Sequence, residues 1–171
     1  MSKNKIIACG DNSQAAGRDV NNFIINQNST FIFNPQDLAD IIDAIFSSTD
    51  IEETPIYDFN VINIEEKNQK NNITTEFYEE CIKEAVGYFS NIDNFLKNPN
   101  NKDYKNKFFG IVNILKPKVI NAIQNGQNMQ NILCHLFDYF YETNQVCSID
   151  KKPLIMVLAY YMYHNCYIGR K

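Results

Sequence analysis

Two pairs of cysteine and histidine are the clearest candidates for catalytic or metal-binding chemistry in this chain of 171 residues. One pair is Cys134 with His135, and the other is His164 with Cys166. Four such ligands could bind Zn²⁺ if the two segments faced each other. Adjacent residues on a helix point about 100° apart, however, so the four side chains are not expected to converge. The sequence predicts structural roles for them, without a metal or a cofactor.

A cysteine nucleophile is the second chemical possibility. His164 lies two residues before Cys166 and is of the type that activates a thiol. Nothing nearby in the sequence supplies an orienting carboxylate or an oxyanion hole, so the pattern does not favour a hydrolase. We therefore expect a protein that is not an enzyme. A cysteine hydrolase, or a metal-dependent nuclease that uses the aspartates, is kept as the alternative.

A glycine-containing segment near the N-terminus shares some residue types with phosphate-binding loops. It contains Gly10, Gly17, Arg18 and Asp19. No Gly-Lys-Ser/Thr follows, G-x-G-x-x-G is absent, and no helix is expected to begin there. The glycines are better explained as residues that permit tight turns.

A basic cluster with aromatic neighbours lies further along the chain, and aromatic residues among lysines are typical of proteins that bind single-stranded nucleic acid. Phe108 and Phe109 fall on a core-facing stripe, however, and the chain is acidic, with a net charge of -4 and few arginines. Direct nucleic-acid binding is therefore not favoured, although an accessory of that kind is a further alternative. The lysines of the cluster are Lys102, Lys105, Lys107, Lys116 and Lys118.

Helices are the main elements that would position these residues, because apolar side chains recur at helical spacing along most of the chain. The last predicted helix is apolar on nearly every side and should lie in the middle of a bundle. Pro117 falls inside the third and should kink or split it. The predicted helices cover 35–46, 74–97, 103–124, 129–140 and 154–166.

The first 33 residues lack helical periodicity. Short β-prone runs at 6–8, 23–25 and 31–33 alternate with Gly, Asn and Asp, which predicts strands joined by tight turns. A lone hairpin is marginal in water, so this arm must dock on the domain or pair with copies of itself. A strand-like alternation also appears at 59–64.

The predicted fold class is α+β, mainly α: a β-rich N-terminal arm followed by a bundle of about five helices. Three segments follow from the pattern: an oligomerisation arm at 1–33, a short helix with an acidic linker at 34–72, and a helical interaction domain at 73–171. Residues 1–98 are acidic overall and residues 99–171 are basic overall. This distribution favours head-to-tail contacts or a basic face presented to an acidic partner, and a solvated helix face is the simpler explanation. Without an apolar run of membrane-spanning length or a signal peptide, a cytoplasmic protein without membrane attachment is expected.

Three stretches of the sequence resemble a known family. Residues 70–84 read KNNITTEFYEECIKE, residues 88–102 read YFSNIDNFLKNPNNK, and residues 161–169 read YMYHNCYIG. With these patterns the chain resembles the C-terminal domains of ABC-ATPase three-component systems, the Lamassu-like prokaryotic conflict systems. Tyr167 departs from the closing motif of that family, which usually reads Cys-Asp-Ile-Gly. The segment GDNSQAAGRDVN at 10–21 resembles the β-rich segment that often precedes such domains.

The resemblance implies a system in which an SMC-like ATPase, a small middle component and an effector act together against phages and plasmids. We expect a non-enzymatic module that tethers or regulates an effector, with the ATPase or the effector as its partner, and a homo-oligomer. A phage-encoded interfering protein is a further alternative. The residues predicted to bind the partner are Tyr163, Asn165, Cys166, Tyr167, Ile168 and Gly169. Those predicted to assemble copies are Asp11, Ser13, Ala15, Ala16, Gly17, Arg18, Asp19 and Asn21.

Overall fold

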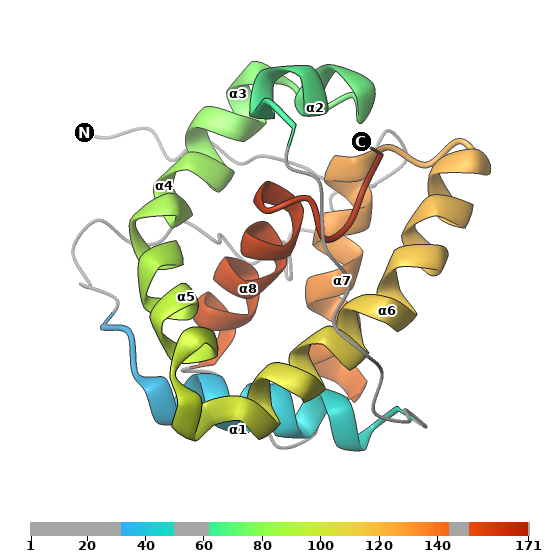
Figure 1. Ribbon diagram of the computed structural model, residues 1–171. Helices are drawn as coiled ribbons and strands as arrows, with labels where there is room; N and C mark the ends of the chain where they lie inside the picture. The colour runs from blue at the N-terminus through green and yellow to red at the C-terminus, as the bar shows by residue number, and fades with distance from the viewer. Residues whose placement is uncertain (1–31, 50–61, 144–150, 171) are drawn as a thin grey trace, which may run out of the picture.

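The computed structural model describes residues 32–49, 62–143 and 151–170, and every regular element in these ranges is a helix (Figure 1). The helical part of the predicted fold class is confirmed. The strands predicted for the N-terminal arm lie outside the described residues, apart from Ile32 and Phe33, which are not in a strand. The α-helices are α1 (Pro35–Ser47), α2 (Ile64–Lys70), α3 (Thr75–Phe77), α4 (Lys83–Ala85), α5 (Phe89–Lys97), α6 (Lys102–Gln124), α7 (Met129–Thr143) and α8 (Lys152–His164).

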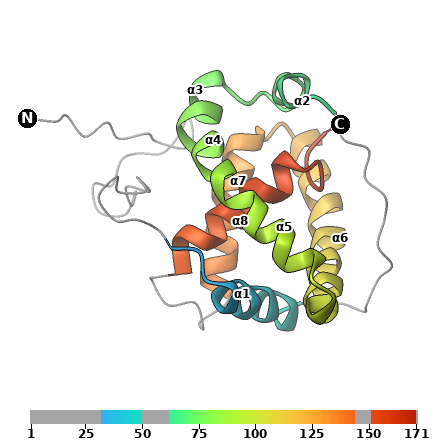
Figure 2. The same cartoon turned by 60° about the vertical axis from the view of Figure 1, so that its left-hand side comes forward.

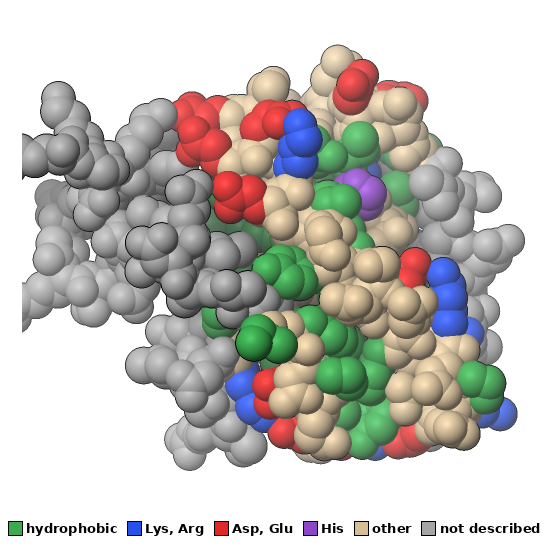
Figure 3. Space-filling view, turned by 90° about the vertical axis from the view of Figure 1, so that its left-hand side faces the viewer, with side chains coloured by type: hydrophobic (Ala, Val, Ile, Leu, Met, Phe, Trp, Pro, Cys, Tyr) green, Lys and Arg blue, Asp and Glu red, His purple; other side chains and the backbone are tan. Residues whose placement is uncertain are grey.

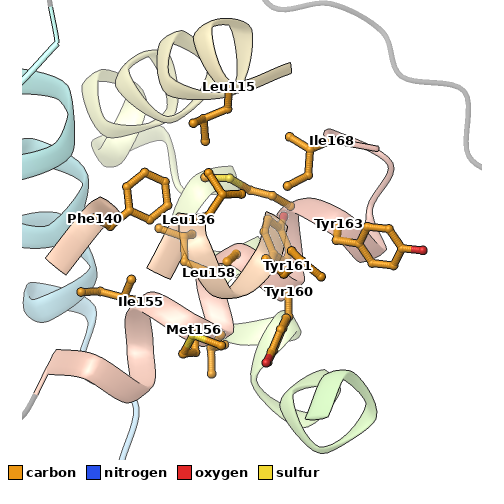
Figure 4. Close-up of a cluster of buried hydrophobic side chains, with 14 of the residues drawn as sticks. Leu115, Leu136, Phe140, Ile155, Met156, Leu158, Tyr160, Tyr161, Tyr163 and Ile168 are labelled. Carbon is orange, nitrogen blue, oxygen red and sulfur yellow. The ribbon is translucent and has the colours of Figure 1, made fainter. Parts of the chain in front are cut away.

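Helix α8 lies in the middle of the other helices, as its sequence predicts (Figures 1 and 2). Each residue from Leu154 to Tyr163 is buried. Figure 4 shows side chains of α8 such as Leu158 and Tyr161 together with Leu136 and Phe140. Because α8 has no polar face, it can be stable only with packing partners all around it.

Helix α1 forms where the sequence predicts it. The side chain of Asn34 accepts a hydrogen bond from the backbone N–H of Gln36 at 3.0 Å, and Pro35 occupies the first turn. The apolar face of α1, which includes Leu38 and Ile42, is buried against α6 and α8. This helix therefore belongs to the same core as the helices that follow it.

The predicted helix at 74–97 exists but is irregular. The side chain of Thr74 accepts a hydrogen bond from the N–H of Phe77 at 3.1 Å, as a helix N-cap does. A π-helical turn at Tyr78–Ile82 and a 3₁₀ turn at Val86–Tyr88 then interrupt the α-helical pattern. The wider π turn brings residues five apart closer to one face, and Phe77 and Ile82 are both buried.

Helix α6 is continuous through Pro117, so of the predicted kink or split at this residue the split is wrong. Val112, Leu115 and Val119 are all buried in the same core, and their packing holds the turns before and after the proline together. The helix ends at Asn125-Gly126, as predicted. Gly126 has a φ of 87°, and its N–H donates to the carbonyl of Ile123 in a left-handed cap.

Helix α2 is not predicted by the sequence pattern, which suggests a linker and a strand-like alternation ending at Ile64. Instead, Ile64 begins this helix, because the side chain of Asn63 accepts hydrogen bonds from the N–H groups of Glu65 and Glu66. Two glutamates in the first turn favour the helix further. The remaining part of that alternation, 59–61, lies outside the described residues.

Candidate functional site

The residues that follow α8, at 165–170, form a turn that we call the closing turn. Cys166 has a φ of 61°, a conformation that side-chain-bearing residues rarely adopt. Its N–H donates to the carbonyl of Tyr163 at 3.1 Å, and the N–H of Tyr167 donates to the carbonyl of Met162 at 2.9 Å. These two bonds are those of a Schellman motif, in which glycine usually occupies the left-handed position. The backbone of the closing turn is therefore specifically constrained.

Asn71, the residue that ends α2, holds the closing turn from the side. Its amide donates to the carbonyls of Lys67 and Arg170, each at 2.8 Å, and its side-chain oxygen accepts from the N–H of Arg170 at 2.7 Å. Gly169 has a φ of 87°, and a Cβ there would lie 3.0 Å from that oxygen. Because Asn71 is almost fully buried, water cannot easily replace these bonds.

Lys67 of α2 is fully buried against the end of α8. Its ammonium donates a hydrogen bond to the carbonyl of Tyr163 and lies 4.2 Å from the centroid of the same tyrosine ring. A positive charge at a helix C-terminus is favourable, and the aromatic face adds a cation–π contact. The hydroxyl of Tyr163 donates to the side chain of Asn68 at 2.9 Å, so α2 contacts both ends of this residue.

Tyr167 packs between aromatic rings on the body of the domain. Its ring centroid lies 5.6 Å from each of Phe108 and Phe109. Its hydroxyl is hydrogen-bonded to the hydroxyl of Tyr161. The Tyr161 hydroxyl donates to the carboxylate of Asp93 on α5. Burial, followed by the bond to Asp93, raises the pKa of Tyr161 far above its ordinary value. Burial also raises the pKa of Tyr167. Both hydroxyls therefore stay protonated at neutral pH and serve as hydrogen-bond donors.

Residues 27–169 match a family model described as C-terminal domain 12 of the ABC-three component (ABC-3C) systems. The chain belongs to this family. The match includes all helices from α1 to α8 and ends at Gly169 of the closing turn. The resemblance that the sequence suggests is confirmed at the level of a domain of ABC-three component systems. Comparison with curated proteins and with solved structures gave no match.

The predicted partner-binding residues of this ABC-3C domain differ in what they expose. The side chains of Asn165 and Tyr167 are half-buried and reach the surface. The amide of Asn165 also donates to the carbonyl of Tyr161 at 3.0 Å. A partner-binding role for the segment stays a prediction, and its accessible part is centred on these two residues. The other four, Tyr163, Cys166, Ile168 and Gly169, are buried.

The residues predicted to assemble copies, between Asp11 and Asn21, lie outside the described residues, so this role stays a prediction. Of the predicted basic cluster, Lys107 lies between two carboxylates, at 2.6 Å from Asp103 and 3.0 Å from Asp43. Phe108 and Phe109 are buried in the core, as their stripe predicts, and do not offer a stacking surface for bases.

The cysteine and histidine pairs do not come together as ligands. In the ranges that the structure describes, no three His, Cys, Asp or Glu residues gather in a way that could hold a metal ion. Cys166 is only 1% exposed, which keeps its thiol away from solvent. His164 is half-buried against the ring of Phe89, with ring centroids 5.2 Å apart. Burial and then the charge of Lys67 lower the pKa of His164 below its ordinary value.

The contacts made by Lys67 and Asn71 are not apparent from the sequence alone. Both residues lie in a segment whose composition suggests an acidic and amide-rich linker. One signal was available: Ile64, Lys67, Asn68 and Asn71 follow the spacing of one helix face after a capping Asn63. None of the described helices of this domain is long and apolar enough to cross a membrane.

Proposed function

We propose that this ABC-3C domain is a non-enzymatic interaction module that tethers or regulates an effector. In this proposal the closing turn contacts a protein partner of the same system, either the SMC-like ABC ATPase or the effector. The N-terminal residues between Asp11 and Asn21 assemble copies of the chain. Membership of the family supports the assignment to an ABC-three component system, and the geometry of the closing turn supports the choice of surface.

The observation that carries the proposal is that the closing turn is held in one conformation by buried groups. Lys67 and Asn71 contact its backbone from one side, and the Schellman motif at Cys166 fixes it from within. A surface loop with so many buried backbone contacts loses little conformational entropy when it binds. Pre-organisation of this kind is useful in a binding surface.

The exposed parts of the closing turn have the chemistry of a protein contact. Tyr167 presents part of a ring that is rigid because Phe108 and Phe109 pack against it. Tyrosine is enriched among residues that dominate binding energy, because its ring is large and its hydroxyl can form hydrogen bonds. Asn165 adds an amide beside it.

The test is the affinity of the full chain for the ATPase and the effector of its own system, measured by calorimetry. We expect Tyr167→Ala to weaken binding of one of them about tenfold or more, as a central interface tyrosine would. Asn121→Ala, at an exposed position on α6, serves as the control. Unfolding midpoints of the variants separate a binding defect from a folding defect.

Unchanged affinity of Tyr167→Ala and Asn165→Ala for both components would contradict the proposed surface. The assembly of copies has its own test in light scattering of the full chain. We expect Arg18→Glu to lower the particle mass. A monomer for the unaltered chain would contradict a homo-oligomer.

A further inference from the structure

Most charges on the described surface are paired within the molecule. Lys83 lies 2.5 Å from Glu79, Lys97 lies 3.0 Å from Asp93, and Lys151 lies 2.6 Å from Asp40. Lys70 pairs with Glu66, and Lys107 pairs with two aspartates. Among the charges that no described ion pair neutralises, Glu80 with Glu84 and Lys102 with Lys105 form two groups of like sign, and these define two faces.

The first face is the outer side of α3, the π turn and α4, which we call the acidic face. Glu80 and Glu84 are exposed there and make no ion pair with a described residue. They lie one turn apart, and like charges at this spacing destabilise a helix slightly. Figure 3 shows acidic side chains gathered at the edge of this side of the molecule.

The acidic face continues into an apolar and open surface. Val86 is 37% exposed, and a Cβ on Gly87 would meet nothing within 4 Å. Glycine inside an exposed helix is unfavourable, by roughly 1 kcal/mol relative to alanine. The helix therefore carries two locally unfavourable features on its outer side, uncompensated like charges and a bare backbone, which are expected where another chain approaches.

The second face lies at the beginning of α6, and we call it the basic face. Lys102 is exposed and Lys105 is half-buried, and neither makes an ion pair with a described residue. Asp103 between them is bound to Lys107 at 2.6 Å. The basic face thus carries two positive charges that are not neutralised within the described fold.

We infer that the acidic face of one copy docks on the basic face of a second copy. The two faces cannot pair within one molecule, because α3 and α4 lie apart from α6 in Figures 1 and 2. A contact between two different surfaces is head-to-tail and can close into a ring or extend into a filament. Lysines of the neighbouring copy form ion pairs with Glu80 and Glu84. Beside these pairs, the neighbouring copy packs closely against Val86 and Gly87.

This contact does not depend on the N-terminal residues that are proposed to assemble copies, and charge reversals at the two faces distinguish it from that assembly. Ions screen exposed charges over about 10 Å at 0.1 M ionic strength and about 3 Å at 1 M. The contact between the faces should therefore weaken over this range. Arg18→Glu should disrupt the assembly through the N-terminal residues and should leave the salt-sensitive contact between the faces in place.

The experiment measures the mass of the full chain by light scattering and sedimentation at about 0.1 M and about 1 M salt. We expect Glu80→Lys with Glu84→Lys to remove the salt-sensitive association, and Lys102→Glu with Lys105→Glu to do the same. An equimolar mixture of the two variants should restore it, because each face of one variant then meets an oppositely charged face of the other. Asp138→Lys, at an exposed position on α7, is the control and should associate like the unaltered chain.

Association that is independent of salt, or a mixture that stays dissociated, would overturn the inference. So would an acidic face that binds a basic partner protein but not a second copy. Since Glu80, Glu84 and Lys102 are exposed and Lys105 is half-buried, the variants should keep their unfolding midpoints. If a reversal unfolds the chain, Glu80→Gln with Glu84→Gln removes the charge more mildly and should still lower the association at 0.1 M salt.

Discussion

The two ends of the central helix are held in different ways. At its C-terminal end, α2 contributes a fully buried ammonium and a nearly buried amide to the backbone of the closing turn. At its N-terminal end, Lys151 pairs with Asp37 and Asp40 of α1, and these carboxylate side chains are 37% and 44% exposed. A buried polar contact leaves an unpaired group when one partner is removed, whereas water replaces a partner at the surface.

The comparison suggests that the domain has one firmly fixed end and one adaptable end. The closing turn is fixed, which suits a binding surface, and the contacts between α1 and its neighbours can be lost with less consequence. The hydrogen bond that the ammonium of Lys151 donates to Asp40 raises the pKa of Lys151 and lowers that of Asp40, so both groups stay charged at neutral pH. Exposure to solvent nevertheless limits what such an ion pair contributes to the stability of the fold.

Removal of the buried lysine should have the largest effect. Lys67→Ala removes the buried ammonium from the carbonyl of Tyr163, which keeps the N–H of Cys166 as a donor, and opens a cavity in place of the lysine stem. We expect the free energy of unfolding to fall by about 3 kcal/mol. Chemical denaturation measures it.

Lys70→Ala is the control for that variant, since Lys70 lies on the same helix with a side chain that is 44% exposed. It should change stability by less than about 0.5 kcal/mol. If both variants lost the same stability, the contrast between buried and exposed contacts would not hold.

Substitution of the glycine in the closing turn should have the second largest effect on stability. Gly169→Ala forces a side chain into a left-handed conformation and against the oxygen of Asn71. We expect a loss of about 2 kcal/mol. Gly126→Ala imposes the same φ of 87° where a Cβ meets nothing within 4 Å, so it should lose about 1 kcal/mol.

The difference between these two variants reports the contacts of the new Cβ with Asn71 and with the ring of Tyr163, because the backbone strain is common to both. Gly87→Ala should change stability in the opposite direction. No positive φ and no neighbour oppose it, so it should gain up to about 1 kcal/mol. Equal losses of stability for Gly169→Ala and Gly126→Ala would mean that the contacts with Asn71 and Tyr163 add nothing to the cost of the substitution.

Acid should weaken the fixed end through His164. Its pKa is lowered in the folded state from an ordinary 6.5, so the unfolded chain binds the proton more readily. Stability should therefore fall as the pH drops below about 6.5, and His164→Gln should reduce this fall. His135→Gln, at an exposed position on α7, is the matched control. Denaturation midpoints at several pH values measure the slope, and equal slopes for His164→Gln and the unaltered chain would contradict the expectation.

The smallest effect should come from the ion pairs near α1. Lys107→Met keeps the aliphatic stem and removes a charge that lies between Asp43 and Asp103. We expect a loss below about 1 kcal/mol that shrinks further in high salt. A loss as large as that of Lys67→Ala, measured under the same conditions, would reverse the comparison.

The sequence predicts the helical bundle well because its signals are local or periodic. The cap at Asn34, the stop at Gly126 and the apolar surface of α8 each follow from a few neighbouring residues. The contacts between α2 and the end of α8 could not be predicted in this way, because Lys67 and Tyr163 are 96 positions apart. A lysine in an acidic stretch gives no sign that it will be buried, and Cys166 gives no sign of a left-handed conformation.

The candidate site could be located in the sequence but not resolved into its parts. The closing motif points to residues 163–169, yet the pattern does not tell which of them face the core. The structure separates Tyr167 and Asn165, which reach the surface, from Cys166 and Ile168, which are buried. Burial of this kind depends on packing against α5 and α6, which no local pattern records.

Hydrogen exchange at the amide of Arg170 tests the central claim most directly. Arg170 is exposed and lies outside the helices, and exposed amides of this kind usually exchange freely. Because its N–H donates to the buried oxygen of Asn71, we predict clear protection in the unaltered chain and loss of that protection in Asn71→Ala. Rapid exchange in the unaltered chain, as fast as in an unstructured peptide, would contradict a closing turn fixed by α2.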